Sequence, residues 1–289
     1  MGLTSGALAQ AQLSFIWLEL TGKCQLHCRH CYAESGPRGT HGSMTRADWT
    51  RVIDEAVDLG VSLIQFIGGE PTLHPDFPAL VCHAARRGVG VEIFSNMVRV
   101  TDELWRVFEH PGVRLACSYY SGDAREHDAI TGRRSHEKTL ANVREAVRRG
   151  IRLRVAVISM TESQDVNGTV NHLRHLGVEE VDVDRLRHVG RGIRDQEPAV
   201  DQLCGRCADG VLAVTPGGEV LPCVFARSMV IGSVRHRALA EINSDAAPVR
   251  AKLAAAFSRR ATLPPDCQPV KPDGGCRPAP CKPILQRPR

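Results

Sequence analysis

Residues 18–32 read LELTGKCQLHCRHCY, which places Cys24, Cys28 and Cys31 in a loop directly after an apolar, strand-like segment at 13–20. In parallel α/β folds the functional groups gather where the strands end, so this position indicates a functional site. Four-iron clusters normally take four thiolates. Three cysteines would therefore leave one iron with an open position for an outside ligand.

The cysteine content of the whole chain also favours metal binding. Its 289 residues include eleven cysteines, an odd number that disulfide pairing cannot complete. In a reducing compartment thiols stay reduced unless they bind metal or do redox work. A zinc ion completed by His27 or His30 and cysteines without metal are the alternatives, although zinc sites favour paired Cys-x2-Cys knuckles.

Apolar strand-like segments alternate with amphipathic helical ones over most of the chain. The predicted strands are 13–20, 62–67, 90–95, 113–119, 151–158 and 179–185. The predicted helices are 45–59, 77–87, 102–108, 137–149 and 166–176, with another near 246–260. Repeats of this size predict an α/β fold with a partial (β/α)6 barrel, and an open doubly wound sheet is the alternative.

Composition argues against several classes of protein. Hydrophobic residues make up 43% of the chain, too many for a disordered protein, and no apolar run is long enough to span a membrane. The first residues lack the pattern of a secretory signal, which predicts a cytoplasmic location. A net charge of +5 spread along the chain, with only 4% aromatic residues, argues against nucleic-acid binding.

The cysteine loop resembles the signature of the radical S-adenosylmethionine (SAM) superfamily, in which SAM chelates the open iron of a [4Fe–4S] cluster. Further matches follow in order over about residues 14–192. The segment 68–71, Gly-Gly-Glu-Pro, resembles the family's GGE motif, in which glycines let the backbone approach the ligand and a carboxylate pairs with the SAM ammonium. The resemblance implies SAM contacts from His30, Gly68, Gly69, Glu70, Ser95, Asn96, Ser118 and Arg154.

One of these residues, His30, departs from the family pattern, and strand alternation predicts the direction of another, Ser118. The family usually has an aromatic residue just before the third cysteine, near adenine, where this chain has His30. An imidazole can stack in that place, and it can also protonate. On the fourth strand, alternation predicts that Ser118 faces the ligand and that its neighbour Cys117 faces the helices.

A second group of cysteines follows the predicted barrel. Cys204 and Cys207 form a Cys-x2-Cys knuckle, and Cys223 follows a predicted hairpin through 215–218. This pattern resembles the SPASM or twitch extension, which binds an auxiliary [4Fe–4S] cluster, and residues 185–192 resemble its bridge to the core. A second auxiliary cluster and a zinc ribbon are the alternatives. The implied ligands are Cys204, Cys207 and Cys223, with a fourth from the tail cysteines Cys267, Cys276 and Cys281.

These features divide the chain into three predicted parts. A radical SAM core covers 13–194, an auxiliary-cluster region covers 195–261, and a tail rich in proline and cysteine covers 262–289. The tail has no periodicity and cannot pack a core alone, so it is either disordered or held by its cysteines.

The resemblance implies an enzyme that reductively cleaves SAM to a 5′-deoxyadenosyl radical, with a low-potential electron donor of the flavodoxin or ferredoxin type. It favours oxidative modification of a ribosomally made peptide, such as a crosslink. Only about twelve residues precede the first strand, so we expect a separate protein to recognise a leader peptide. A dehydrogenase or epimerase of a small sugar or aminoglycoside natural product and a non-enzymatic zinc scaffold are alternatives. The sequence singles out no catalytic side chain.

Overall fold

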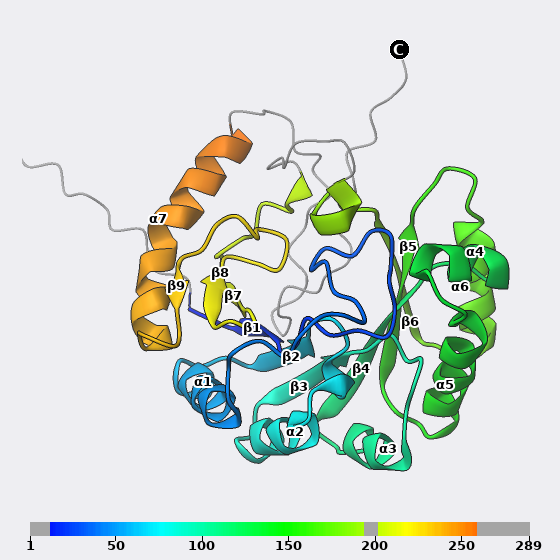
Figure 1. Cartoon of the computed structure of the whole chain (residues 1–289), viewed down its shortest axis with the longest axis horizontal. Coiled ribbons are helices and arrows are strands. Elements are labelled where there is room, and N and C mark those ends of the chain that lie inside the picture. Colours follow the sequence, from blue (N-terminus) through cyan, green and yellow to red (C-terminus); the bar gives the residue numbers. More distant parts are fainter. Residues whose placement is uncertain (1–11, 194–201, 259–289) are drawn as a thin grey trace, which may run out of the picture.

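A computed structural model describes residues 12–193 and 202–258 (Figure 1). Its strands form one sheet in the order β6-β5-β4-β3-β2-β1-β7-β8-β9. Strands β1 to β7 are parallel to their neighbours, and β8 and β9 add antiparallel pairs at one edge. The strands are β1 Phe15–Glu19, β2 Leu63–Ile67, β3 Gly90–Phe94, β4 Val113–Tyr119, β5 Leu153–Ser159, β6 Glu180–Arg185, β7 Val211–Val214, β8 Glu219–Leu221 and β9 Gly232–Ser233.

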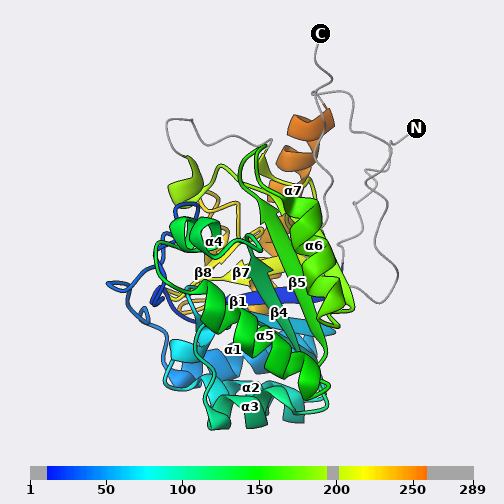
Figure 2. The same ribbon diagram turned by 90° about the vertical axis from the view of Figure 1, so that its right-hand side faces the viewer.

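Helices follow the strands and cover one face of the sheet, as two perpendicular views show (Figures 1 and 2). The α-helices are α1 Arg46–Asp58, α2 Phe77–Arg86, α3 Asp102–Phe108, α4 Ala124–Thr131, α5 His136–Arg148, α6 Val166–His175 and α7 Leu239–Ser258. Short 3-10 turns are η1 Pro71–Leu73 and η2 Gly190–Ile193. No pairing closes β6 onto β9 in the described chain, so the predicted α/β fold is an open, partial barrel. None of the described helices is long and apolar enough to cross a bilayer.

Five β/α repeats and the sixth strand, all within the described residues, confirm the predicted order of strands and helices, with small shifts at their ends. Helix α4 was not predicted, because it buries only His127 and Thr131 and so lacks an apolar stripe. Helix α7 begins at Leu239, earlier than the predicted 246, because Leu239 and Ile242 anchor its first turn in the core.

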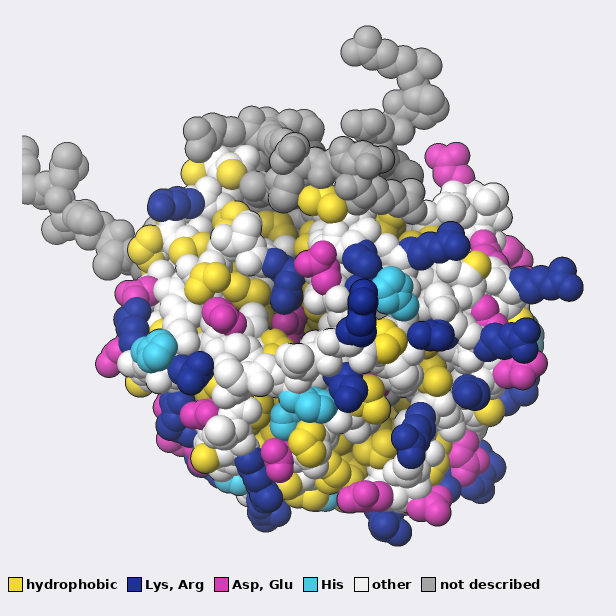
Figure 3. Space-filling model, viewed as in Figure 1, with side chains coloured by type: hydrophobic (Ala, Val, Ile, Leu, Met, Phe, Trp, Pro, Cys, Tyr) yellow, Lys and Arg dark blue, Asp and Glu magenta, His cyan; other side chains and the backbone are white. Residues whose placement is uncertain are grey.

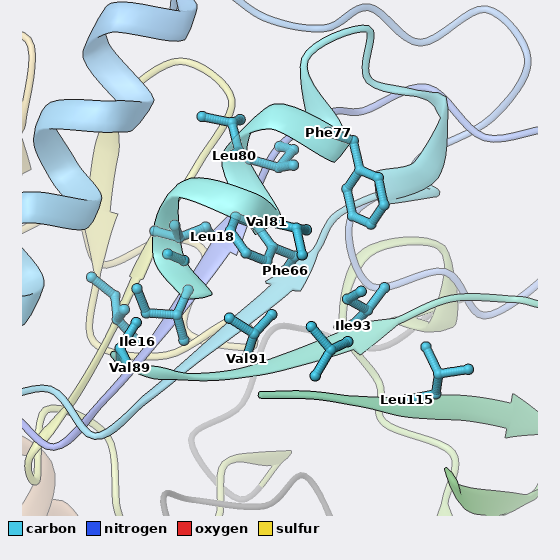
Figure 4. Packing of buried hydrophobic residues seen from close by; sticks show 14 of the residues in the cluster. Ile16, Leu18, Phe66, Phe77, Leu80, Val81, Val89, Val91, Ile93 and Leu115 are labelled. Carbon is cyan, nitrogen blue, oxygen red and sulfur yellow. The ribbon is translucent and has the colours of Figure 1, made fainter. Parts of the chain in front are cut away.

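The parallel strands alternate between two apolar clusters. Ile16 and Leu18 of β1 pack against the helices, together with side chains of β2, β3 and α2 (Figure 4). Trp17, between them, belongs to the cluster on the opposite face. The same alternation puts Cys117 in the helix-side core and Ser118 on the opposite face, as predicted.

The sheet continues across the predicted boundary between core and extension. Strand β7 pairs in parallel with β1, Phe15 opposite Val211, and the predicted hairpin then returns the chain as β8. The extension is therefore packed directly against the first strand of the barrel, next to the cysteine loop.

Candidate active site

A cavity lies at the carboxyl ends of the parallel strands, on the face opposite the helices, and encloses about 1130 Å³ with its open mouth included. Figure 3 shows the side seen in Figure 1, where Lys and Arg side chains stand among hydrophobic ones. The predicted site residues that line the cavity are Cys24, Cys28, Cys31, His30, Gly68, Gly69, Ser95, Asn96 and Ser118. The structure thus gathers residues from four strand ends at one site.

Helix α4 supports the cysteine loop through its last turn. The backbone N–H groups of His27 and Arg29 donate to the carbonyls of Thr131 and Ile130, each at 3.0 Å. Gly132 ends the helix with a φ of +71°, and a Cβ there would lie 2.7 Å from the carbonyl oxygen of His27. Only glycine fits this close approach without strain.

Arg191, in η2, holds the same loop from the other side. Its Nε donates to the carbonyl of Cys28 at 2.9 Å, and its Nη2 donates to the carbonyl of Ser35 at 2.7 Å. Its backbone N–H donates to the carbonyl of Cys31 at 3.0 Å. Arg191 was not among the predicted site residues, although it lies in the segment 185–192 that resembled a bridge between core and extension.

The three thiols fit an iron–sulfur cluster. Burial raises the pKa of Cys24 and of Cys28 to about 12, so the loop by itself favours neutral thiols. A bound metal deprotonates a coordinating thiol outright. The backbone N–H of Leu26 and the side-chain amide of Asn96 donate to Cys24 Sγ at 3.4 and 3.6 Å, and such donors help to set a cluster's potential.

A zinc site is not formed in the described part of the chain. Zinc ligands converge on one ion at about 2.0–2.3 Å. Within 12–193 and 202–258, no three His, Cys, Asp or Glu side chains converge in the way that a single metal ion requires. His27 and His30 therefore do not complete a zinc site with the loop cysteines.

The two glycines after β2 approach the cysteine loop and not only the cavity. Gly69 donates its N–H to the carbonyl of Thr21 at 2.6 Å. A Cβ on Gly68 would lie 2.6 Å from that carbonyl, and one on Gly69 would lie 2.3 Å from the carbonyl of Lys23. The glycines thus let two strand ends pack backbone to backbone beneath the thiols.

Glu70 lies behind the cavity wall. Its side chain is buried, and its carboxylate accepts the Asn96 N–H at 2.8 Å and the Thr72 hydroxyl at 2.7 Å. Asn96 in turn donates to Cys24 Sγ and accepts from the amide of Gln25 at 2.9 Å. Glu70 and Asn96 therefore join the second and third strand ends to the first cysteine.

Arg154 lies deeper in the barrel than its predicted SAM contact requires, and it is not part of the cavity lining. Its guanidinium donates to both carboxylate oxygens of Glu92 at 2.8 and 2.9 Å, below the ring of Phe94. Its inward direction agrees with strand alternation, but its height along the strand differs. Ile158, four residues later on β5, lines the cavity instead.

His30 offers the cavity a neutral imidazole. Burial, with a smaller effect from the Arg191 charge, lowers the pKa of His30 to about 4. Its Nδ1 is buried and has no hydrogen-bond partner within the described residues. The ring of Tyr120 lies edge-on to it, with centroids 4.9 Å apart. Of the two roles left open by the sequence, stacking is the one this environment favours.

Only part of the second cysteine group lies within the described residues. Cys207 and Cys223 are buried in the apolar cluster of the inner face, with their Sγ atoms 3.1 Å apart. Cys204 is half-buried nearby in sequence. The predicted tail ligands Cys267, Cys276 and Cys281 lie outside the described residues.

Comparison with known proteins identifies this arrangement. The model of the radical SAM superfamily matches residues 18–173. The chain belongs to the radical SAM superfamily. A second model, the SPASM iron–sulfur cluster-binding domain, matches residues 204–269 and begins at Cys204. The chain is therefore a radical SAM enzyme of the SPASM branch, whose cofactors are a [4Fe–4S] cluster, SAM and auxiliary iron–sulfur chemistry.

Related radical SAM proteins cover most of the chain. It is 28% identical over 268 residues to "PqqA peptide cyclase" of Streptomyces rochei, covering 78% of this chain and 74% of the relative. It is 27% identical over 320 residues to the protein of the same name from Xanthomonas euvesicatoria pv. vesicatoria (strain 85-10), covering 94% and 84%.

Solved structures share the fold at low identity. Streptococcus suis SuiB bound to S-adenosylmethionine matches with a TM-score of 0.68 and 14% identity, over 81% of this chain and 65% of that one. SuiB bound to its precursor peptide SuiA matches with a TM-score of 0.70 and 13% identity, over 85% and 67%. BtrN in complex with AdoMet and 2-DOIA matches at 0.51 and 18%, over 86% and 90%. The chain thus spans about two thirds of SuiB.

Proposed function

We propose that this radical SAM enzyme oxidatively modifies a ribosomally synthesised peptide, most simply by forming a crosslink within it. The observation that carries the proposal is the similarity, over most of both lengths, to relatives named PqqA peptide cyclase. The fold is also shared with SuiB, which has been crystallised with a precursor peptide. Fold alone does not select a substrate, so the relatives carry the argument.

The cavity supplies what such a reaction needs from the protein. When bound, the cluster and SAM together supply a 5′-deoxyadenosyl radical that removes a hydrogen atom from the substrate. Trp17, Ile67 and Phe94 give the cavity an apolar wall that keeps water from the reacting atoms. The polar groups offered to SAM come from Ser95, Asn96 and Ser118. The backbone of Gly68 and Gly69 and the neutral ring of His30 lie beside them.

Several partners complete the proposal. One auxiliary [4Fe–4S] cluster is bound by Cys204, Cys207 and Cys223, with a tail cysteine as the fourth ligand. A flavodoxin or ferredoxin supplies the low-potential electron, and a separate protein presents the leader of the peptide. We place the reaction in the cytoplasm, where the ligand thiols stay reduced.

The test is anaerobic reconstitution followed by reaction with SAM, dithionite and a candidate peptide encoded beside this gene. We expect 5′-deoxyadenosine and a peptide that has lost two hydrogens, with fragmentation locating the new bond. Turnover of a small sugar or aminoglycoside with no change in any peptide would overturn the proposal.

A further inference from the structure

The segments that follow the two cysteine groups touch each other through aromatic rings. Tyr32 directly follows Cys31, and Phe225 stands two residues after Cys223. The two ring centroids lie 5.3 Å apart, with the rings edge-on at 71°. One non-bonded step therefore separates two short covalent paths, each of which begins at a predicted cluster ligand.

The Phe225 ring is held on the side of the barrel by Arg187. The guanidinium carbon of Arg187 lies 5.7 Å from the ring centroid. The same guanidinium donates to Asp184 Oδ1 at 2.9 Å and to the carbonyl of Gln202 at 3.1 Å. Because Gln202 precedes Cys204 by two residues, this contact ties both halves of the second cysteine group to the end of β6.

The Tyr32 ring is held by an ion pair whose carboxylate, Glu19, is buried and whose Arg227 side chain is 30% exposed. The guanidinium carbon of Arg227 lies 5.8 Å from the Tyr32 centroid. Its Nη1 donates to both oxygens of Glu19 at 2.9 and 3.2 Å, and Glu19 is 1% exposed. Although burial disfavours its charge, the Glu19 carboxylate raises the pKa of Arg227. The buried carboxylate orients Arg227, because separating the pair would leave the charge of Glu19 uncompensated.

We propose that Tyr32 and Phe225, held by Arg187, Arg227 and Glu19, form a ring bridge that carries electrons between the auxiliary cluster and the SAM-binding cluster. Electron tunnelling falls off more steeply across non-bonded gaps than along covalent bonds. The ring bridge contains a single such gap, filled by ring contact. This inference rests on the proposed function for the presence of an auxiliary cluster at Cys223.

The electron balance of the step is simple. One electron leaves the reduced auxiliary cluster and enters the oxidised SAM-binding cluster, and the reverse transfer follows the same rings. Neither ring is oxidised or reduced, and no proton or covalent bond changes place. The electron is supplied by a low-potential one-electron donor, which is photoreduced deazaflavin in the experiment below.

The experiment uses the reconstituted full chain without peptide or SAM. A light flash with deazaflavin injects electrons, and rapid freezing followed by electron paramagnetic resonance records how the signals of the two clusters interconvert. We expect Phe225→Leu to slow the interconversion about tenfold, because a gap replaces the ring contact. The matched control, Tyr32→Phe, keeps both rings and should retain the rate of the unmodified chain.

Iron counting makes each outcome decisive. An unchanged rate in Phe225→Leu, with about eight irons bound per chain as two four-iron clusters require, overturns the ring bridge and leaves the proposed function intact. About four irons in the unmodified chain overturns the auxiliary cluster and the bridge together. If Phe225→Leu and Tyr32→Leu both lose iron while Tyr32→Phe keeps it, the rings hold the clusters in place and the electron route is overturned.

Discussion

The two cysteine groups of this chain are built in different ways. The first occupies one loop, whose backbone is bonded to α4, to Arg191 and to the glycine turn after β2. The second brings Cys207 and Cys223 together inside an apolar cluster, and its predicted fourth ligand comes from a distant part of the chain. The first loop is supported mainly by hydrogen bonds, and the second mainly by packing.

The site that initiates the reaction is therefore built from local contacts, whereas the second site depends on the rest of the fold. A loop with three ligands and many backbone bonds needs only its neighbours to keep its shape. A group spread over many residues is assembled only when the extension docks on β1. We therefore expect damage to the first loop to abolish chemistry, and damage to the second to remove only part of it.

The largest expected effect compares one cysteine from each group. Cys24→Ala should leave no detectable 5′-deoxyadenosine, because the SAM-binding cluster loses a ligand. Cys207→Ala should lose about half of the bound iron but keep SAM cleavage, while peptide modification stops. Iron content, nucleoside and peptide mass are measured on the same anaerobic samples. Equal loss of SAM cleavage in both variants would erase the proposed difference between the groups.

The next effect tests Arg191 as a support of the first loop. Arg191→Ala should lower cluster content and SAM cleavage about 10–100-fold, as loss of a residue that orients metal ligands does. Iron counting and 5′-deoxyadenosine formation measure it. Arg125→Ala, an exposed arginine on α4, is the control and should behave as the unmodified chain. A normal iron content in Arg191→Ala would show that the loop keeps its shape without that side chain.

The third effect concerns the buried histidine of α4. Burial, helped by the charge of His136, lowers the pKa of His127 from 6.5 to about 4. Between these values the unfolded chain binds a proton that the folded chain does not, so the free energy of unfolding falls as the pH drops. The loss should reach about 3 kcal/mol between pH 7 and 4.

Urea unfolding of the metal-free chain across this range measures the pH dependence of stability. His127→Gln should weaken that dependence and leave the part that comes from other buried histidines such as His30, whereas His236→Gln, at an exposed position, should leave it unchanged. The same slope in all three proteins would contradict the role assigned to burial of His127.

The smallest effect concerns the close approach of two backbones under the first loop. Gly69→Ala would place a Cβ 2.3 Å from the carbonyl of Lys23, which forces the strand ends apart. We expect a loss of about 1–3 kcal/mol in unfolding free energy. Gly112→Ala is the control, since its Cβ would meet nothing closer than 3.7 Å. Thermal or urea unfolding of both variants compares them, and equal stability would rule out the strain.

Local patterns in the sequence account for most of the fold and part of the site. Apolar periodicity belongs to each segment separately, so it located the strands and helices of the repeats but missed α4, whose buried face is polar. Strand alternation correctly predicted that Ser118 faces the cavity. The family resemblance implied a SAM contact for Arg154, but its guanidinium binds Glu92 deeper in the barrel, because a match to a strand does not indicate how far along the strand a residue lies.

The identity of the first site was already contained in a short stretch of the chain, because three ligands within eight residues share one loop whatever surrounds it. The supports of that site were not. Arg191 binds Cys28 across 163 positions, and Arg227 binds Glu19 across 208. Such pairs meet only after the sheet has formed and the extension has joined β1. No local spacing encodes them, because each partner is selected by three-dimensional packing and by the cost of burying a charge alone.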